Sequence, residues 1–252
     1  MKSGIAFLSG GKDSVLSMHL AHNQGIKITG IMTMIPEDQE SMLYHTHNIS
    51  LVKTIAKVTG LNWIPVSASK DREIEALTDA LSKQKSEYLI TGGIESNFQK
   101  KKFDSACEET GMEHYAPIWG ITPENLYQKI LENKLDVIIV SVAALGLGEE
   151  WLGRHLDKKS IEELLGLAKK YRFNAVGEGG DLDTLVLDGP LYSNKLEPIE
   201  SKRIWYGDRG KLEIPELRII EKWYRMLDNL KTGLQDAIKK FVGNDEIDEQ
   251  TV

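Results

Sequence analysis

The sequence has one cysteine, Cys107, and therefore can form neither an internal disulfide nor a Cys-x-x-Cys metal or redox site. It has no apolar run of the length that a membrane span requires. The first residues lead straight into a short apolar segment, so we expect no signal peptide and a cytoplasmic location. Positive charge is also scarce, because 31 Lys and Arg face 38 Asp and Glu, a net charge of −7. This balance argues against direct nucleic-acid binding, which normally needs a basic face.

What is present is enough apolar sequence for a proper core. The 252 residues are 41% apolar and 27% charged, which allows one large domain or two small ones. We find no internal repeat and no low-complexity segment. Residues 244–252 are polar and acidic, and we expect them to form a frayed tail.

The most informative segment lies between an apolar run, residues 5–8, and a second apolar run that starts at Val15. This order predicts a buried strand, a glycine turn and a helix whose first N–H groups face an anion. Glycines let the backbone approach that anion closely. Lys12 adds positive charge, and Asp13 could hold Mg²⁺. The predicted nucleotide-binding residues of this loop are Ser9, Gly10, Gly11, Lys12, Asp13 and Ser14.

Two familiar phosphate loops do not fit this segment. A Walker A loop needs glycine five residues before Gly11, where the chain has Ala6, and Asp13 follows the lysine. The dinucleotide pattern G-x-G-x-x-G lacks its third glycine. The segment instead resembles the PP-loop, S-G-G-x-D-S, of the N-type ATP pyrophosphatases, which cleave ATP between its α and β phosphates.

Strand and helix signals alternate along the first half of the chain. This alternation predicts an α/β fold, a Rossmann-like parallel sheet with helices on both faces. The predicted strands are residues 5–8, 27–34, 61–66, 88–90 and 115–119. The predicted helices are residues 45–58, 71–81, with Asp71 as N-cap, and 97–110, closing at Gly111.

The second half is less regular and predicts a smaller α+β C-terminal domain. Thr122 and Pro123 suit the start of a helix, and Ser160 opens a capping-box pattern. Further predicted elements are strands 137–142 and 184–187, an antiparallel pair 199–206 and 211–220, and a final helix 223–241. We therefore predict a nucleotide domain at 1–120, a substrate-side domain at 121–225, and a C-terminal helix and tail at 226–252.

Ligands of open parallel sheets bind outside the carboxyl ends of the strands, which selects the loops that should surround the phosphate loop. One is the turn after strand 88–90, where glycines allow a flat adenine or ribose to lie against the backbone. Its candidate residues are Gly92 and Gly93 for the nucleotide, and Glu95, Ser96 and Gln99 for a polar substrate. An ordinary turn between strand and helix is the alternative for this segment.

A second candidate segment precedes the helix predicted at 45–58. Tyr44 offers an aromatic face, and His45 offers a ring that titrates near neutral pH. His47 is equally close, so spacing does not choose between the two histidines. A structural role is the alternative for both.

A third candidate segment, residues 177–184, combines glycines with three carboxylates and a hydroxyl. If the segment is extended, alternation puts Asp181 and Asp183 on one face. Such a group suits a cation, ammonia or a metal-bound phosphate, and a solvated acidic turn is the alternative. Its candidate residues are Glu178, Gly179, Gly180, Asp181, Asp183 and Thr184.

These segments, in this order, resemble the diphthine–ammonia ligase family of ATP pyrophosphatases. The resemblance rests on SGGKDS, MLYH, GGIESNFQK, VAALGLG and GEGGDLDT, and runs from Ser9 to about Tyr192. Family members usually carry E-G-G-E-[YF]-E-T, whereas this chain has Asp181, Leu182 and Asp183 there. Phe98 also stands where tyrosine is common. The substrate pocket is where these departures would matter.

The resemblance implies an ATP-dependent ligase with ATP and Mg²⁺ as cofactors and diphthine-bearing elongation factor 2 as protein substrate. ATP would adenylate the diphthine carboxylate, and ammonia would then displace AMP. The implied catalytic residues are Lys12 and Asp13, which stabilise the departing pyrophosphate, and Glu178, which with Asp181 and Asp183 attracts ammonium and helps to remove its proton. A membrane partner is not expected, and a homodimer stays open.

The same residues are also compatible with two other functions. One is another PP-loop enzyme that acts on RNA, such as a tRNA-modifying ligase or thiolase; one cysteine and the acidic balance argue against these. The other is a sensor that binds ATP without catalysis. Release of pyrophosphate from ATP would separate the sensor from the enzymes.

Overall fold

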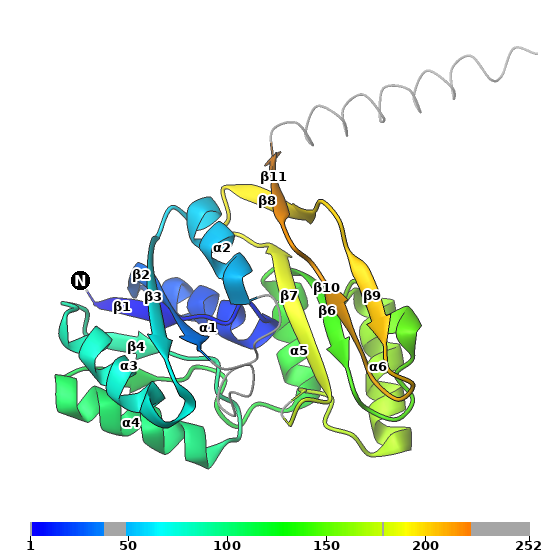
Figure 1. The fold of residues 1–252 in the computed structure, drawn as a ribbon, viewed down its shortest axis with the longest axis horizontal. Coiled ribbons are helices and arrows are strands. Elements are labelled where there is room, and N and C mark those ends of the chain that lie inside the picture. Colours follow the sequence, from blue (N-terminus) through cyan, green and yellow to red (C-terminus); the bar gives the residue numbers. More distant parts are fainter. Residues whose placement is uncertain (1, 38–48, 178, 223–252) are drawn as a thin grey trace, which may run out of the picture.

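The computed structural model describes residues 2–37, 49–177 and 179–222. The predicted final helix at 223–241, and the residues Tyr44, His45 and Glu178, lie outside this part of the chain. None of the helices in the described ranges is long and apolar enough to cross a membrane. The described residues form three sheets with six α-helices around them (Figure 1).

The first sheet is parallel and confirms the predicted Rossmann-like architecture. Its strand order is β3-β2-β1-β4-β5, and every neighbouring pair is parallel. The chain builds outward from β1 on one side and then returns to add β4 on the other, so a ligand crevice is expected between β1 and β4. The strands are β1 (Ser3–Phe7), β2 (Lys27–Pro36), β3 (Asn62–Ala68), β4 (Tyr88–Ile90) and β5 (Glu113–Tyr115).

Helices cover both faces of this sheet, because alternate residues of β1 are apolar on each side. Ala6 and Leu8 belong to the core cluster under the first two helices, whereas Ile5 and Phe7 belong to the cluster under the next two. These helices are α1 (Lys12–Asn23) and α2 (Val52–Thr59), then α3 (Glu73–Ser82) and α4 (Asn97–Thr110). Short 3-10 turns, Ile49–Leu51 and Lys70–Arg72, precede α2 and α3.

The remaining strands form two antiparallel sheets. The larger has the order β7-β6-β10-β9, and the smaller pairs β11 with β8. The strands are β6 (Asp136–Val142), β7 (Leu182–Asp188), β8 (Asn194–Pro198), β9 (Lys202–Trp205), β10 (Gly210–Glu213) and β11 (Leu217–Glu221). The helices are α5 (Pro123–Glu132) and α6 (Lys158–Tyr171), with a 3-10 turn at Glu149–Trp151.

One apolar core joins the two parts of the molecule. The cluster that contains Val15 of α1 also contains Leu126 of α5 and Leu185 of β7. We call the part with the parallel sheet the N-terminal half and the part with the antiparallel sheets the C-terminal half. The two lie side by side, with α1 and α5 between their sheets (Figure 1). The domain boundary near residue 120 stays a prediction.

Several helix ends follow the predicted signals. The Thr122 side chain accepts a hydrogen bond from the Asn125 N–H, and Pro123 occupies the first turn of α5. Helix α4 ends at Gly111, whose φ of +71° is the left-handed conformation that glycine adopts without strain.

Several predicted boundaries differ from the structure, and three of them have a clear local cause. Strand β5 is Glu113–Tyr115 rather than 115–119, because the chain turns after Tyr115 and the Trp119 N–H bonds the Ala116 carbonyl. Helix α6 begins at Lys158, since Asp157 accepts the Ser160 N–H and is the N-cap. Helix α3 begins at Glu73 with Arg72 as its N-cap, and the prediction of Asp71 as N-cap was wrong, because Asp71 lies within a 3-10 turn.

The predicted hairpin was half correct. β9 pairs with β10, as expected, but the predicted strand 211–220 breaks at residues 214–216. Pro215 lies in this break, where its missing N–H prevents a continuous ladder. The chain beyond it forms β11, which pairs with β8 instead.

Candidate functional site

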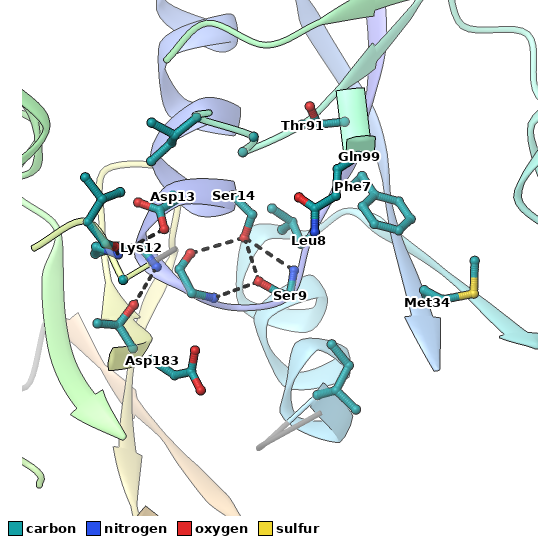
Figure 2. Close-up of a pocket in the computed structure, with 18 of the residues that line it drawn as sticks. Phe7, Leu8, Ser9, Lys12, Asp13, Ser14, Met34, Thr91, Gln99 and Asp183 are labelled. Carbon is teal, nitrogen blue, oxygen red and sulfur yellow. Dashed lines mark hydrogen bonds and ion pairs between the residues drawn. The ribbon is translucent and has the colours of Figure 1, made fainter. Parts of the chain in front are cut away.

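A pocket at the carboxyl end of β1 collects most of the predicted phosphate-site residues (Figure 2). It lies at the expected crevice between β1 and β4 and also receives residues of β7. The residues predicted from the sequence that line it are Ser9, Gly11, Lys12, Asp13, Ser14, Gly92, Gly93, Gln99, Asp183 and Thr184. Both halves of the molecule therefore build one site.

The loop between β1 and α1 is braced by its own two serines. The Ser14 hydroxyl donates to the Gly11 carbonyl at 3.1 Å and lies 3.3 Å from the Ser9 hydroxyl. Gly10 has a φ of +86°, a left-handed conformation that favours glycine. Gly11 is the N-cap of α1 and has no side chain that could cap the helix. The positive end of α1 therefore faces the pocket, where it suits a phosphate group.

Gly92 brings the loop after β4 into direct contact with the start of α1. A Cβ atom at this position would lie 2.5 Å from the Ser14 backbone nitrogen and 2.7 Å from the Asp13 carbonyl carbon. No side chain fits such a gap. Gly93 is different, because its nearest neighbour would be the Trp119 ring at 3.8 Å. The close approach therefore requires glycine at 92 and tolerates a small side chain at 93.

Lys12 does not point freely into the pocket but joins α1 to the C-terminal half. Its side chain is 2% exposed, and its Nζ pairs with Asp13 Oδ2 at 2.9 Å. The same Nζ donates to the Val176 carbonyl at 2.5 Å. This carbonyl belongs to the turn that precedes the acidic glycine segment, so Lys12 fixes that segment beside the loop.

Strand β7 of the C-terminal half also forms hydrogen bonds with the phosphate loop. The Lys12 N–H donates to Thr184 Oγ1 at 3.0 Å, and the Val186 N–H donates to the Gly10 carbonyl at 3.0 Å. The Thr184 hydroxyl thus accepts a hydrogen bond from the first amide of α1. The substrate binding that the sequence predicted for Thr184 stays a prediction.

A buried tyrosine holds the turn that Lys12 contacts. The Tyr127 hydroxyl of α5 donates to the Ala175 carbonyl at 2.6 Å. Burial raises the pKa of Tyr127 above its ordinary value, and the Asp13 charge adds to the effect. Tyr127 therefore stays neutral and acts as a donor to this turn.

The acidic glycine segment divides its carboxylates between two environments. Asp183 lines the pocket, near Lys12 in Figure 2. Asp181 instead accepts the Asn174 N–H at 2.8 Å and does not line the pocket. The expected shared face is absent because Asp181 precedes β7, in a turn where Gly179 and Gly180 are left-handed.

The segment after Gly93 also divides. Gln99 lines the pocket, whereas Ser96 accepts the Gln99 N–H at 3.4 Å and caps α4. Glu95 is not a lining residue. Ser96 therefore has a structural role in positioning α4.

Sequence reasoning missed the apolar end of the pocket. Phe7, Met34 and Phe103 line it, and the rings of Phe7 and Phe103 meet edge to face at a centroid distance of 5.3 Å. Phe7 ends β1 and Met34 lies near the end of β2, so the rule that ligands bind at the carboxyl ends of strands could have found both. Thr91, directly after β4, could have been found in the same way.

The carboxylates of the pocket fit a divalent cation that arrives with a nucleotide. Mg²⁺ is usually bound by one or two carboxylates together with substrate phosphates. Asp13 and Asp183 both line the pocket, and the Asp13 side chain is 28% exposed. Within the described ranges no group of three or more His, Cys, Asp or Glu side chains could hold a metal alone. The two lining carboxylates suit a metal that is held jointly with phosphate.

Two models of known protein domains match this chain. Residues 1–114 match the model of the diphthamide synthase N-terminal domain, and residues 122–220 match that of the diphthamide synthase C-terminal domain.

Curated relatives carry one name. A diphthine–ammonia ligase of Bos taurus is 27% identical over 241 residues, covering 86% of this chain and 90% of that protein. One of Rattus norvegicus is 29% identical, covering 85% and 89%. A diphthine–ammonia ligase of Schizosaccharomyces pombe is 26% identical, covering 76% of this chain and 35% of that longer protein.

Among solved structures, a predicted subunit of tRNA methyltransferase from Methanocaldococcus jannaschii is 12% identical. The match covers 75% of this chain and 98% of that one, with a TM-score of 0.39. The two matched domain models together cover most of the chain. The protein therefore belongs to the diphthamide synthase family.

Proposed function

We propose that this protein is an ATP-dependent carboxylate–ammonia ligase that converts diphthine on elongation factor 2 to its amide and releases AMP and pyrophosphate. The observation that carries the proposal is the N-terminus of α1, which shares one pocket with an apolar end and with Asp183. The names of the curated relatives support the same substrate. A cytoplasmic location follows from this substrate and stays a prediction.

The pocket has two ends that suit the two ends of ATP. The glycine loop and the first turn of α1 would bind the β and γ phosphates, which leave as pyrophosphate. Phe7, Met34 and Phe103 offer apolar and aromatic surface for the adenine ring, and the Gln99 amide could bond its polar edge. Gly92 and Gly93 also line the pocket, and the ribose would pass close to their backbone.

Asp13 is the residue that would hold Mg²⁺, with Asp183 facing the same space. When bound, Mg²⁺ neutralises charge on the phosphate oxygens. Lys12 supports this site indirectly, because its ammonium pairs with Asp13 and fixes the turn at Val176. We infer that Lys12 positions the carboxylate and that its positive charge also favours the departing pyrophosphate.

Adenylation makes the chemistry possible because a free carboxylate has no adequate leaving group for an amine. The acyl-adenylate supplies AMP as that group. Ammonium must then reach the acyl carbon, and Asp183 places negative charge in the pocket that attracts it. Glu178 was predicted to share this role and lies outside the described residues.

The test is release of pyrophosphate and AMP when the protein meets ATP, Mg²⁺, ammonium and diphthine-bearing elongation factor 2. Mass spectrometry of the factor would detect the amide. Asp13→Ala should lower pyrophosphate release by about 10²-fold or more while the fold is kept, and Lys12→Ala should also lower turnover strongly.

The matched control is Asp79→Ala, which removes a carboxylate that pairs with Lys83 on the exposed surface of α3. This variant should keep full activity. Release of pyrophosphate without amide would contradict the acceptor, and full activity of Asp13→Ala would contradict the metal site. Binding of ATP with no release under any condition would favour a sensor.

A further inference from the structure

A chain of three hydrogen-bonded side chains connects the pocket wall with solvent. Thr91 Oγ1 lies 2.7 Å from His114 Nε2, and His114 Nδ1 lies 2.6 Å from Asp104 Oδ1. The three residues come from the end of β4, from β5 and from α4. None of them belongs to the motifs that indicate the family.

The order of donors and acceptors in this chain is fixed by chemistry. An ionised carboxylate only accepts, so His114 Nδ1–H must donate to Asp104. His114 Nε2 then carries a lone pair, and the Thr91 hydroxyl donates to it. The Thr91 oxygen can therefore only accept a hydrogen bond from the pocket side.

The two ends of the chain lie in different surroundings. Thr91 is 2% exposed, lines the pocket and directly precedes Gly92, which packs against the start of α1. The His114 side chain is 6% exposed, whereas that of Asp104 is 43% exposed. A proton that enters at Thr91 would thus have a path through the imidazole to a carboxylate in water.

The charges around His114 keep the ring neutral and its lone pair available. Burial lowers the pKa of His114, the bond to Asp104 opposes this change, and the nearby Lys100 charge adds to it. Burial would raise the pKa of Asp104, but its bonds to Lys100 and His114 hold it below the usual value. Both carboxylate and lysine project from α4, whereas β4 presents the neutral Thr91 hydroxyl.

We propose that Thr91, His114 and Asp104 form a proton relay that converts ammonium to ammonia in the pocket. The inference rests on the proposed function, since it supplies the base for the amidation. Ammonium gives a proton to Thr91 Oγ1 while the Thr91 hydroxyl proton passes to His114 Nε2. The Nδ1 proton then leaves through Asp104 to solvent.

The released ammonia attacks the acyl carbon. The new C–N bond forms as the C–O bond to AMP breaks, AMP takes the bonding electron pair, and the surplus proton on nitrogen goes to water. His114 acts on ammonium through the Thr91 hydroxyl, which is the group that touches the substrate. General bases of this kind contribute about 10²-fold or more to a rate.

Hydroxylamine can show whether the hydrogen bond between Thr91 and His114 acts as a proton relay or only joins β4 to β5. It is neutral at pH 7, so it can attack an acyl-adenylate without prior loss of a proton. In Thr91→Val and His114→Gln we expect the rate of amide formation from ammonium to fall by about 10²-fold. Hydroxamate formation, and pyrophosphate release with hydroxylamine, should keep the wild-type rate.

Two controls accompany these variants. Thr91→Ser keeps the hydroxyl and should restore the ammonium reaction. His155→Gln changes another histidine that bonds a carboxylate, since His155 Nδ1 lies 2.5 Å from Asp136 Oδ1, away from the pocket. It should leave both reactions unchanged. If a variant of the buried Thr91 or His114 fails to fold, Asp104→Asn tests the relay instead, because Asp104 lies at the surface.

The outcomes distinguish failure of the relay from failure of the proposed function. An equal loss with ammonium and hydroxylamine in the folded variants, or no loss with either, would overturn the relay and leave the proposed function intact. If the wild-type protein forms neither amide nor hydroxamate with diphthine-bearing elongation factor 2, the proposed function fails and the relay fails with it. A pH profile for ammonium that is unchanged in His114→Gln would also overturn the relay.

Discussion

The two halves of the molecule hold the phosphate loop by different means. The N-terminal half holds it by shape, because Gly92 places backbone against backbone at the first turn of α1. The C-terminal half holds it by hydrogen bonds, in which Thr184 accepts from the Lys12 N–H and Val176 accepts from the Lys12 side chain. The two sides should therefore respond to different kinds of substitution.

This difference assigns separate tasks to the halves. Contacts that depend on shape tolerate no added volume, since backbone atoms cannot rotate away. Contacts that depend on hydrogen bonds tolerate changes of volume but lose free energy when a buried donor is left without an acceptor. We therefore expect added bulk to act on the Gly92 side and loss of a hydroxyl to act on the Thr184 side.

The largest effect should come from Gly92→Ala. The new Cβ would lie 2.5 Å from the Ser14 nitrogen, so the loop after β4 or the start of α1 must move. Overpacking of this kind costs about 1–3 kcal/mol. If that strain is released when the phosphate loop opens, ATP affinity should fall by up to about 10²-fold, which calorimetric titration would measure.

Gly93→Ala is the matched control, because its Cβ would meet the Trp119 ring at an ordinary 3.8 Å. Because this added methyl group displaces no backbone, it should lower ATP affinity much less than Gly92→Ala does. Equal affinities of the two alanine variants would show that the close approach at Gly92 has no role in shaping the loop.

A smaller effect should appear at the joint between the halves when the pH is lowered. His19 of α1 donates from Nδ1 to the Val15 carbonyl at 2.8 Å, and its Nε2 accepts the Leu191 N–H at 3.3 Å. Burial lowers the pKa of His19 from 6.5 to about 4. Between these values the unfolded chain binds the extra proton, so the free energy of unfolding falls as pH falls.

The expected loss from His19 is about 2 kcal/mol between pH 7.5 and pH 5. Urea unfolding at both pH values would measure it. In His19→Gln the dependence on pH should become flatter by that amount. His22→Gln, at an exposed position of the same helix, should keep the wild-type slope. A wild-type slope in His19→Gln would show that other groups control the acid sensitivity.

The same contrast explains what the sequence could reveal. The loop at Ser9 and the parallel sheet were predictable because their signals are local: an apolar strand, then glycines, then a helix. The hydrogen bond from Lys12 to the Val176 carbonyl joins residues 164 positions apart, and no local sequence pattern around either residue predicts it. The role of Thr184 as a partner of the Lys12 amide was hidden for the same reason.

Local signals also failed where two of them compete. Asp157 and Ser160 are both good N-cap residues, and only the folded chain selects Asp157. Asp181 and Asp183 look equivalent by spacing, but the strand begins between them, so only Asp183 reaches the pocket. Thr91, His114 and Asp104 form no motif at all and meet only through the pairing of β4 with β5 and the packing of α4.

The smallest effect should come from Thr184→Val, which keeps the shape of the side chain and removes its hydroxyl. The buried Lys12 N–H would lose its acceptor, at a cost of about 1 kcal/mol. Because that amide opens α1 beside the phosphate site, ATP affinity should fall by about fivefold, in keeping with this free energy. Thr184→Ser should restore it.

Thr78→Val is the matched control, which tests whether ATP affinity depends on which threonine hydroxyl is removed. The Thr78 hydroxyl donates to the Ile74 carbonyl within α3, a carbonyl that helical bonding also engages. Its removal should change stability slightly and leave ATP affinity as it was. If Thr184→Val behaved in the same way, the hydrogen bond from the C-terminal half would help to hold the two halves together without shaping the nucleotide site, and the contact at Gly92 would be the more important of the two.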